Sequence, residues 1–181
     1  MEEALAIAQV RTGDADAFGV IVENYQAPIQ RYLYRLTGDL EVAKDLAQDT
    51  FVQAYSAILK TDSQLSLRAW LYRIATNNAL HARRHARLLS FIPLDPQQQG
   101  DPAVGIQTGV AAENIAVADA LRQVPPGRRV CMVLHLVEGF TYREIAETLG
   151  ISEDAVRKRV AKGKIEFREC YDSKEGEDEV L

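Results

Sequence analysis

The feature that most constrains the fold is a central stretch of the chain that cannot form regular structure. From Ile92 to Pro102 it carries three prolines and a run of three glutamines, and glycines follow at positions 105 and 109. Proline removes a backbone donor, and a polar stretch of this kind has no apolar face to bury. The sequence therefore predicts two small domains, at residues 1–90 and 113–171, joined by a flexible linker at 91–112.

Both halves show the apolar spacing of helices. Phe18, Ile21, Val22 and Tyr25 follow the i, i+3, i+4, i+7 pattern, Asp14 is a candidate N-cap, and the proline at position 28 allows the helix to restart. Further helices are expected over about 41–59, 67–89, 113–124 and 128–138. No segment has the alternation of a strand, so the predicted class is all-α, with a small helical bundle in each half.

The segment from 141 to 160 has the signature of a helix-turn-helix. Thr141 and Glu144 form a capping box, Gly150 suits the left-handed turn, and Ser152 is placed to cap a short second helix. Basic side chains leave that second helix on one side, which is typical of a recognition helix in the DNA major groove. A plain helical hairpin with a solvated basic face is the alternative. The basic residues are Arg157, Lys158, Lys162, Lys164 and Arg168.

Charge is distributed in blocks, although the net charge is −5. Residues 63–94 carry five arginines and no carboxylate, whereas the tail at 172–181 carries five acids and one lysine. Exposed charges that lie further apart than a Debye length, about 8 Å, are largely screened from one another. A local basic patch is therefore able to bind phosphate although the chain as a whole is acidic. The acidic tail is expected to be solvated, with weak autoinhibition of the basic faces as the alternative.

The N-terminus and the cysteines indicate a cytoplasmic protein. Acidic residues stand where a signal peptide needs basic ones, and no apolar run is long enough to span a membrane, so no membrane insertion is expected. Cys131 and Cys170 are too few for a disulfide framework and lack zinc-site spacing. His81 and His85 have metal-ligand spacing but no third ligand, while Cys131 and His135 are expected to lie in the core.

Three strings resemble one family along nearly the whole chain. They are Asp45–Phe51, the stretch Trp70–Asn77 followed by Arg83 and Arg84, and Glu138–Ala146. In these strings the chain resembles the extracytoplasmic-function (ECF) group of bacterial RNA polymerase sigma factors. The resemblance implies a region-2 domain at 1–90 and a region-4 domain at 113–171, with no catalytic activity and no cofactor.

The resemblance also implies what each surface binds. One helix face would capture the melted non-template strand of the minus-10 element, with the Asn77 amide reading an unstacked base. Those residues are Arg73, Asn77, His81, Arg83, Arg84 and Arg87. The minus-35 duplex would be read by Arg143, Ser152, Asp154, Arg157, Lys158 and Lys162. The clamp coiled coil of core polymerase would be contacted by Glu41, Asp45, Gln48, Asp49 and Phe51.

The implied partners are core RNA polymerase, through its clamp coiled coil and flap, promoter DNA, and an anti-sigma factor. One departure from the family pattern leaves the minus-35 base preference open, because Asp154-Ala155 stands where many members have Gly-Thr. Two other functions fit parts of the sequence. A dimeric regulator would bind duplex DNA through the helix-turn-helix and use the N-terminal half as a sensor. A mimic of an anti-sigma antagonist would use the acidic N-terminal helices.

Overall fold

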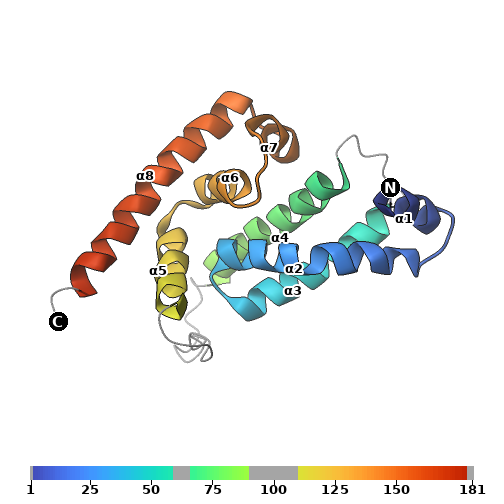
Figure 1. Cartoon of the computed structure of the whole chain (residues 1–181), viewed down its shortest axis with the longest axis horizontal. Helices are drawn as coiled ribbons and strands as arrows, with labels where there is room; N and C mark the ends of the chain where they lie inside the picture. Colours follow the sequence, from blue (N-terminus) through green and yellow to red (C-terminus); the bar gives the residue numbers. More distant parts are fainter. Residues whose placement is uncertain (1, 59–65, 90–109, 179–181) are drawn as a thin grey trace.

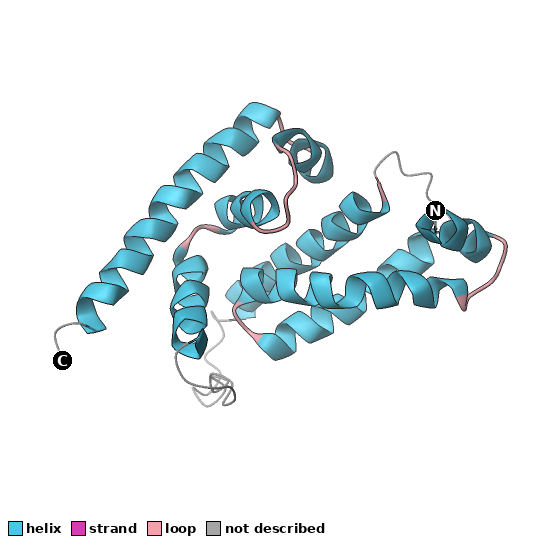
Figure 2. Ribbon diagram, in the orientation of Figure 1, coloured by secondary structure: helices cyan, strands magenta, loops and turns pink. Residues whose placement is uncertain are grey.

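The structure is a computed structural model that describes the backbone of residues 2–58, 66–89 and 110–178. Side chains are described for residues 5–58, 66–85 and 116–173. All regular structure within these ranges is helical, which confirms the all-α class (Figures 1 and 2). The predicted linker at 91–112 lies outside the described residues except for its last three positions, which belong to a helix.

Four helices form the N-terminal bundle. They are α1 (Glu2–Arg11), α2 (Ala17–Thr37), α3 (Leu40–Ile58) and α4 (Leu67–Leu89). Helices α2, α3 and α4 pack against one another, and α1 closes one end (Figure 1). A hydrogen bond joins α2 to α4 inside the core of the bundle. The hydroxyl of the fully buried Tyr32 lies 2.7 Å from the hydroxyl of Thr76. This hydrogen bond satisfies two polar groups that would otherwise be costly to bury.

Two local expectations for this bundle differ from the structure. Helix α2 does not restart at Pro28 but continues through it. Proline costs one backbone hydrogen bond, and the burial of Ile21 and Ile29 on either side outweighs that loss. Helix α1 was not expected, because its apolar residues do not gather on one face of the helix. It packs through Ala6 and Val10, which are both buried. Asp14 does accept backbone N–H groups, from Asp16 and Ala17, at the start of α2.

The C-terminal bundle contains α5 (Val110–Gln123), α6 (Pro126–Leu136), α7 (Tyr142–Leu149) and α8 (Glu153–Asp178). Helix α8 packs on α5, α6 and α7. The second helix of the predicted helix-turn-helix is therefore long rather than short, and it includes most of the tail that was expected at 172–181. Its lysines, arginines and glutamates are good helix formers, and its apolar face is held by α5 and α6.

The two bundles pack against each other. Helix α2 contacts α5 and α6, and α4 contacts α7. The ring of Phe140, between α6 and α7, lies 5.2 Å from the ring of Tyr72 on α4, and the Tyr72 ring packs at a tilt against the Tyr32 ring, 4.9 Å away. Both bundles therefore share one continuous apolar core, which the sequence pattern did not predict.

Candidate functional site

The first candidate surface is the exposed side of α4. Arg73, Asn77, His81 and Arg84 are all exposed, and their spacing places them on one side of the helix. The opposite side is held by Leu71 and Ala75, which are fully buried. This amphipathic division explains why the polar side chains point outward. The structure thus brings these four predicted residues together on one basic, amide-bearing face.

Two neighbouring residues of α4, Asn78 and Arg83, do not belong to this exposed face. The Asn78 amide donates to the hydroxyl of Thr50 on α3 at 3.2 Å, so Asn78 holds the bundle together while Asn77 faces outward. Arg83 is exposed too, but it lines a groove between the bundles together with Arg122 and Arg129. It therefore lies apart from the face that carries Arg73 and Asn77. Arg87 belongs to α4, and its side chain lies outside the described residues.

The helix-turn-helix has the predicted local geometry. Thr141 accepts from the backbone N–H of Glu144, and the Glu144 carboxylate accepts from the backbone N–H of Thr141 at 2.8 Å. These hydrogen bonds hold the pKa of Glu144 below its usual value. Gly150 has φ 66°, a left-handed conformation that ends α7, and the Ser152 hydroxyl accepts from the N–H of Ala155. The turn is confirmed in detail.

The basic side chains at the start of α8 are paired with acids on the same helix. Arg157 lies 2.6 Å from Glu153, and Lys158 lies 2.7 Å from Asp154. On α7, Arg143 pairs with Glu147 at 2.9 Å. All of these pairs are well exposed, so water and counterions screen them, and each contributes little to stability. The pairs can exchange an intrahelical carboxylate for another anion at small cost. Ser152, Asp154 and Lys162 are exposed beside them.

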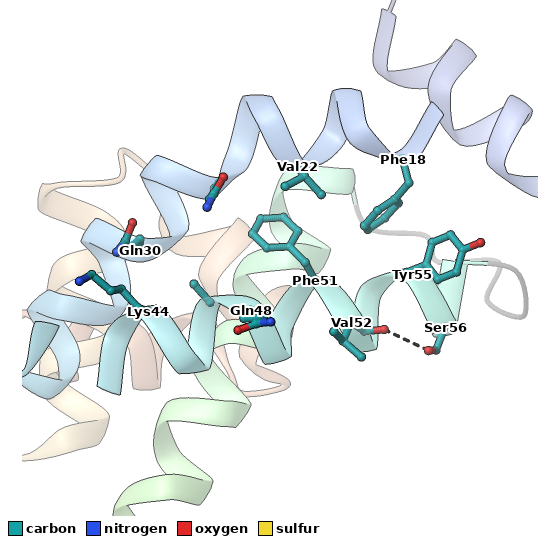
Figure 3. A pocket seen from close by; sticks show the side chains of 11 residues that line it. Phe18, Val22, Gln30, Lys44, Gln48, Phe51, Val52, Tyr55 and Ser56 are labelled. Atoms are coloured by element: carbon teal, nitrogen blue, oxygen red, sulfur yellow. Dashed lines mark hydrogen bonds between the residues drawn. The ribbon is translucent and has the colours of Figure 1, made fainter. Parts of the chain in front are cut away.

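The third surface is the outward side of α3 and the groove between α2 and α3. Phe18 and Val22 of α2 and Phe51 and Tyr55 of α3 line a groove of about 750 Å³ (Figure 3). Gln48 lies at its rim, whereas Asp45 and Asp49 are exposed on α3. Glu41 pairs with Lys44 at 2.6 Å, and Lys44 also lines the groove.

Sequence reasoning missed the apolar part of this third surface. Val52 is 61% exposed and Tyr55 is 38% exposed, although both are residues that usually favour burial. Their position next to the buried Phe51 was visible in the sequence as a wide apolar stripe on α3. The structure leaves Val52 largely exposed, whereas the Tyr55 ring packs edge-on against the Phe18 ring at 5.2 Å. Of the five predicted polymerase contacts, Gln48 and the buried Phe51 line the groove, and Glu41, Asp45 and Asp49 are exposed on α3.

Other features of the described part of the chain are structural. Cys131 is buried, and the His135 Nδ1 donates to the carbonyl of Phe140 at 2.8 Å while its ring stacks on Tyr142. The described histidines, cysteines and carboxylates do not gather into a metal-binding group. None of the described helices has both the length and the apolar character that a bilayer-crossing segment needs.

Comparisons with known proteins agree with this arrangement. The family model for Sigma-70 region 2 matches residues 21–88, and the model for Sigma-70, region 4 matches residues 114–166. The chain is 30% identical to the ECF RNA polymerase sigma factor SigW of Bacillus subtilis, over 90% of this chain and 92% of SigW. It is 28% identical to SigL of Mycobacterium tuberculosis, over 85% of this chain and 88% of SigL.

A solved structure shares the fold of the whole chain. CnrH, solved in complex with the cytosolic domain of CnrY, is 25% identical and has a TM-score of 0.71, covering 96% of this chain and 99% of CnrH. The exposed face of α4, the helix-turn-helix and the α3 surface thus lie within regions that the family models and SigW define. The chain belongs to the ECF group of RNA polymerase sigma factors.

Proposed function

We propose that this protein binds core RNA polymerase in the cytoplasm and directs it to promoters, with no catalytic activity of its own. The observation that carries the proposal is the pair of exposed nucleic-acid-compatible faces, one on α4 and one at the start of α8, each within a matched sigma region. The alternative, a dimeric regulator, would bind DNA through the helix-turn-helix. That function does not explain the basic, amide-bearing face exposed on α4.

The α4 face is proposed to capture the melted non-template strand of the minus-10 element. Arg73 and Arg84 would hold phosphates, and Asn77 between them would place its amide against the edge of an unstacked base. His81 completes this face, and Arg87 adds a further cation along α4. Arg83 would contact DNA, if at all, from the separate groove beside Arg122 and Arg129. Capture of an unstacked base offsets part of the cost of melting the duplex, which amounts to a few kcal/mol.

The helix-turn-helix is proposed to read the minus-35 duplex. Arg143, Arg157, Lys158 and Lys162 supply the cations, while Ser152 and Asp154 stand at the end of the helix that contacts base edges in this motif. Phosphates would replace the intrahelical carboxylates that now pair with Arg157 and Lys158. Because those pairs are exposed, the exchange is inexpensive.

The α3 surface is proposed to bind the clamp coiled coil of polymerase, and the C-terminal bundle to rest on the flap. Asp45, Asp49 and Glu41 would provide charge complementarity, whereas Gln48 and Phe51 border the groove in Figure 3. An anti-sigma factor is the further partner that the family implies, and the similar CnrH was itself solved with a protein partner.

The test is reconstitution with core polymerase on a library of random promoter sequences. Core enzyme plus this protein should be recovered as a complex and should transcribe a small, shared subset of templates from defined start sites. Core enzyme alone should not select that subset. Failure to associate with core polymerase, combined with tight binding of a palindromic duplex by the protein alone, would instead identify a dimeric regulator.

A further inference from the structure

The outermost line of side chains on α8 lies opposite the buried face of that helix. Val156 and Val160 are buried and fix the side of α8 that packs on the bundle. Each residue of an α-helix turns by about 100°, which places Asp154 roughly 140° around the helix from the mean direction of these two valines. Lys158 and Ala161 lie along the same outer line, and both are exposed. Asp154, Lys158 and Ala161 are therefore the side chains best placed to enter a groove of DNA.

The neighbouring acid Glu153 has a different position. By the same turn angle it lies only roughly 40° from the buried side of α8. Its carboxylate accepts from Arg157 at 2.6 Å, and the Arg157 guanidinium lies 5.6 Å from the ring centre of Tyr142 on α7. The Glu153 side chain is 43% exposed, against 71% for Asp154. Glu153 thus lies on the flank of α8 that faces α7, and only Asp154 is on the outer line.

A carboxylate on this outer line opposes the binding of DNA. Duplex DNA carries one negative charge per about 1.7 Å of its axis, and these charges repel the Asp154 carboxylate. In the free protein the carboxylate is paired with Lys158, whose Nζ lies 2.7 Å away. In the proposed complex Lys158 exchanges this carboxylate for a phosphate. Asp154 then loses its partner at the moment when the groove removes water from it.

A desolvated carboxylate needs a new hydrogen-bond donor, because an unpaired charge is costly to bury. The major groove offers two such donors, the N4 amine of cytosine and the N6 amine of adenine. Guanine presents only acceptors there, and thymine presents an acceptor and a methyl group. Adenine places its N7 acceptor beside the amine, where it repels the second carboxylate oxygen. Cytosine is therefore the base that suits Asp154 best.

The place of Asp154 along α8 suits contact with a base edge. The Ser152 hydroxyl accepts from the backbone N–H of Ala155, and this cap fixes the start of α8 two residues before Asp154. In helix-turn-helix proteins the N-terminal residues of the recognition helix contact base edges. Ala161, about two turns further along the outer line, has a short side chain that allows the helix to approach the bases closely.

A purely structural role for Asp154 predicts different behaviour. An acid in the first turn of a helix interacts favourably with the partial positive charge of the N-terminus, and an exposed pair such as Asp154 with Lys158 adds little stability. A role of that kind affects stability, or binding to all sequences alike. Glu153 is in the same turn and has the same structural advantage, so it is a matched control for the charge.

We propose that Asp154 selects cytosine at one position of the minus-35 element, by accepting a hydrogen bond from the N4 amine once Lys158 has passed to a phosphate. This inference rests on the proposed function, and it names a base that the helix-turn-helix reads. The same carboxylate weakens binding to any site without an amine at that position, since its charge is then left unpaired. Asp154 thus lowers the affinity for DNA in general and raises the discrimination among promoters.

The test uses reconstituted holoenzyme and a library built on one promoter that the wild-type holoenzyme transcribes, with only the minus-35 element randomised. Bound templates are sequenced for wild type and for each variant. Wild type should prefer cytosine over thymine at one position by about tenfold. Asp154→Ala should lose this preference and keep the preferences at other positions. Asp154→Asn should favour adenine there, because an amide accepts from N6 and donates to N7. Glu153→Ala should keep the cytosine preference.

The affinity for a mismatched promoter is a second readout. On a promoter with thymine in place of the selected cytosine, Asp154→Ala holoenzyme should bind about fivefold more tightly than wild type, because the unpaired carboxylate is gone. On the cytosine promoter this gain should be absent, since the variant also loses the hydrogen bond to the amine. Circular dichroism and thermal unfolding check that both variants of Asp154 keep their helices.

Two sequencing results would overturn the proposal. One is a base profile of Asp154→Ala that matches wild type, and the other is an equal loss of the cytosine preference in Glu153→Ala. Weaker binding to all sequences alike, together with a lower melting temperature, would also overturn it and would leave Asp154 only a role at the helix N-terminus. A wild-type holoenzyme without any base preference in the minus-35 element would contradict the proposed function itself.

Discussion

At the scale of single residues, the adjacent asparagines of α4 point in different directions, one into the bundle and one to the surface. Asn78 donates into the bundle, whereas Asn77 is exposed between two arginines on the outer face. Helical periodicity predicted this division, because Leu67, Leu71 and Ile74 fix which side of α4 is buried. The same periodicity did not place Arg83, whose position against Arg122 and Arg129 depends on how the two bundles pack.

The role of Asn77 is tested by removing its amide. Asn77→Ala should leave the fold and polymerase binding intact but reduce promoter melting, because the unpaired base loses the partner that offsets its unstacking. Permanganate reactivity of melted thymines should fall on a linear promoter and recover on a pre-melted bubble. Asn24→Ala, the same truncation at an exposed position of α2, is the matched control. Normal melting by Asn77→Ala on both templates would return Asn77 to an ordinary surface position.

The basic residues at the start of α8 are tested one at a time. Arg157→Ala and Lys158→Ala should each weaken binding of the holoenzyme to the minus-35 duplex. A lost phosphate contact lowers the salt slope of binding by about one unit, and a lost base contact costs roughly 1–3 kcal/mol at one position. Arg31→Ala, at an exposed arginine of α2 outside the helix-turn-helix, is the control. Unchanged affinity and salt slope in both variants would remove this face from the DNA interface.

At the scale of elements, the capping box fixes where α7 begins. Thr141→Ala removes the hydroxyl that accepts from the Glu144 N–H and donates to the Glu144 carboxylate, and it should destabilise the protein by about 1 kcal/mol in urea unfolding. The pKa of Glu144 is lower in the folded protein than its usual value of 4.5. The ionised carboxylate therefore stabilises the folded state above pH 4.5, and this stabilisation is lost as the pH falls through the lower pKa of the folded protein. The difference between wild type and Thr141→Ala should therefore shrink below pH 4.5. A difference independent of pH would show that the hydrogen bond from the Thr141 hydroxyl to the carboxylate does not contribute, because the backbone N–H of residue 141 donates to Glu144 in both proteins.

The α3 surface gives a second prediction at this scale. Reversing Asp45 and Asp49 together to lysine should leave the protein folded but weaken its association with core polymerase, mainly through a slower association rate. The double reversal of Glu169 and Asp172, on the exposed end of α8, changes the net charge equally. Surface plasmon resonance against immobilised core enzyme measures both. Equal association rates for the two double variants would move the clamp contact to another surface.

The presence of most helices was easier to predict from the sequence than the residues at which they begin and end. The capping box and Gly150 encode the turn between α7 and α8 locally, so residues 141–152 are as expected from the sequence. Pro28 indicated a break that burial of Ile21 and Ile29 overrides, and α1 was missed because its two buried residues give no strong apolar pattern. Local signals were reliable where a hydrogen bond defines the element. They failed where tertiary burial decides the outcome.

At the scale of the whole molecule, two bundles were predictable and their packing was not. The proline-rich stretch indicated separate halves, but the contacts of Arg129 with Leu36 and of Glu138 with Tyr72 join residues 93 and 66 positions apart. Nothing in the local sequence identifies such partners. The surfaces proposed for polymerase, for the minus-10 element and for the minus-35 element lie on different helices, and the proposed function needs all three at once.

The proposed function requires one chain to read two separated promoter elements for core polymerase. The direct measurement is a combined footprint of the reconstituted holoenzyme on a promoter selected from the random library. We predict hydroxyl-radical protection of duplex about 25 base pairs upstream of a segment whose thymines become permanganate-reactive, and neither signal with core enzyme alone. A single symmetric patch of protected duplex, formed by the protein without polymerase and with no melted thymines, would contradict the account.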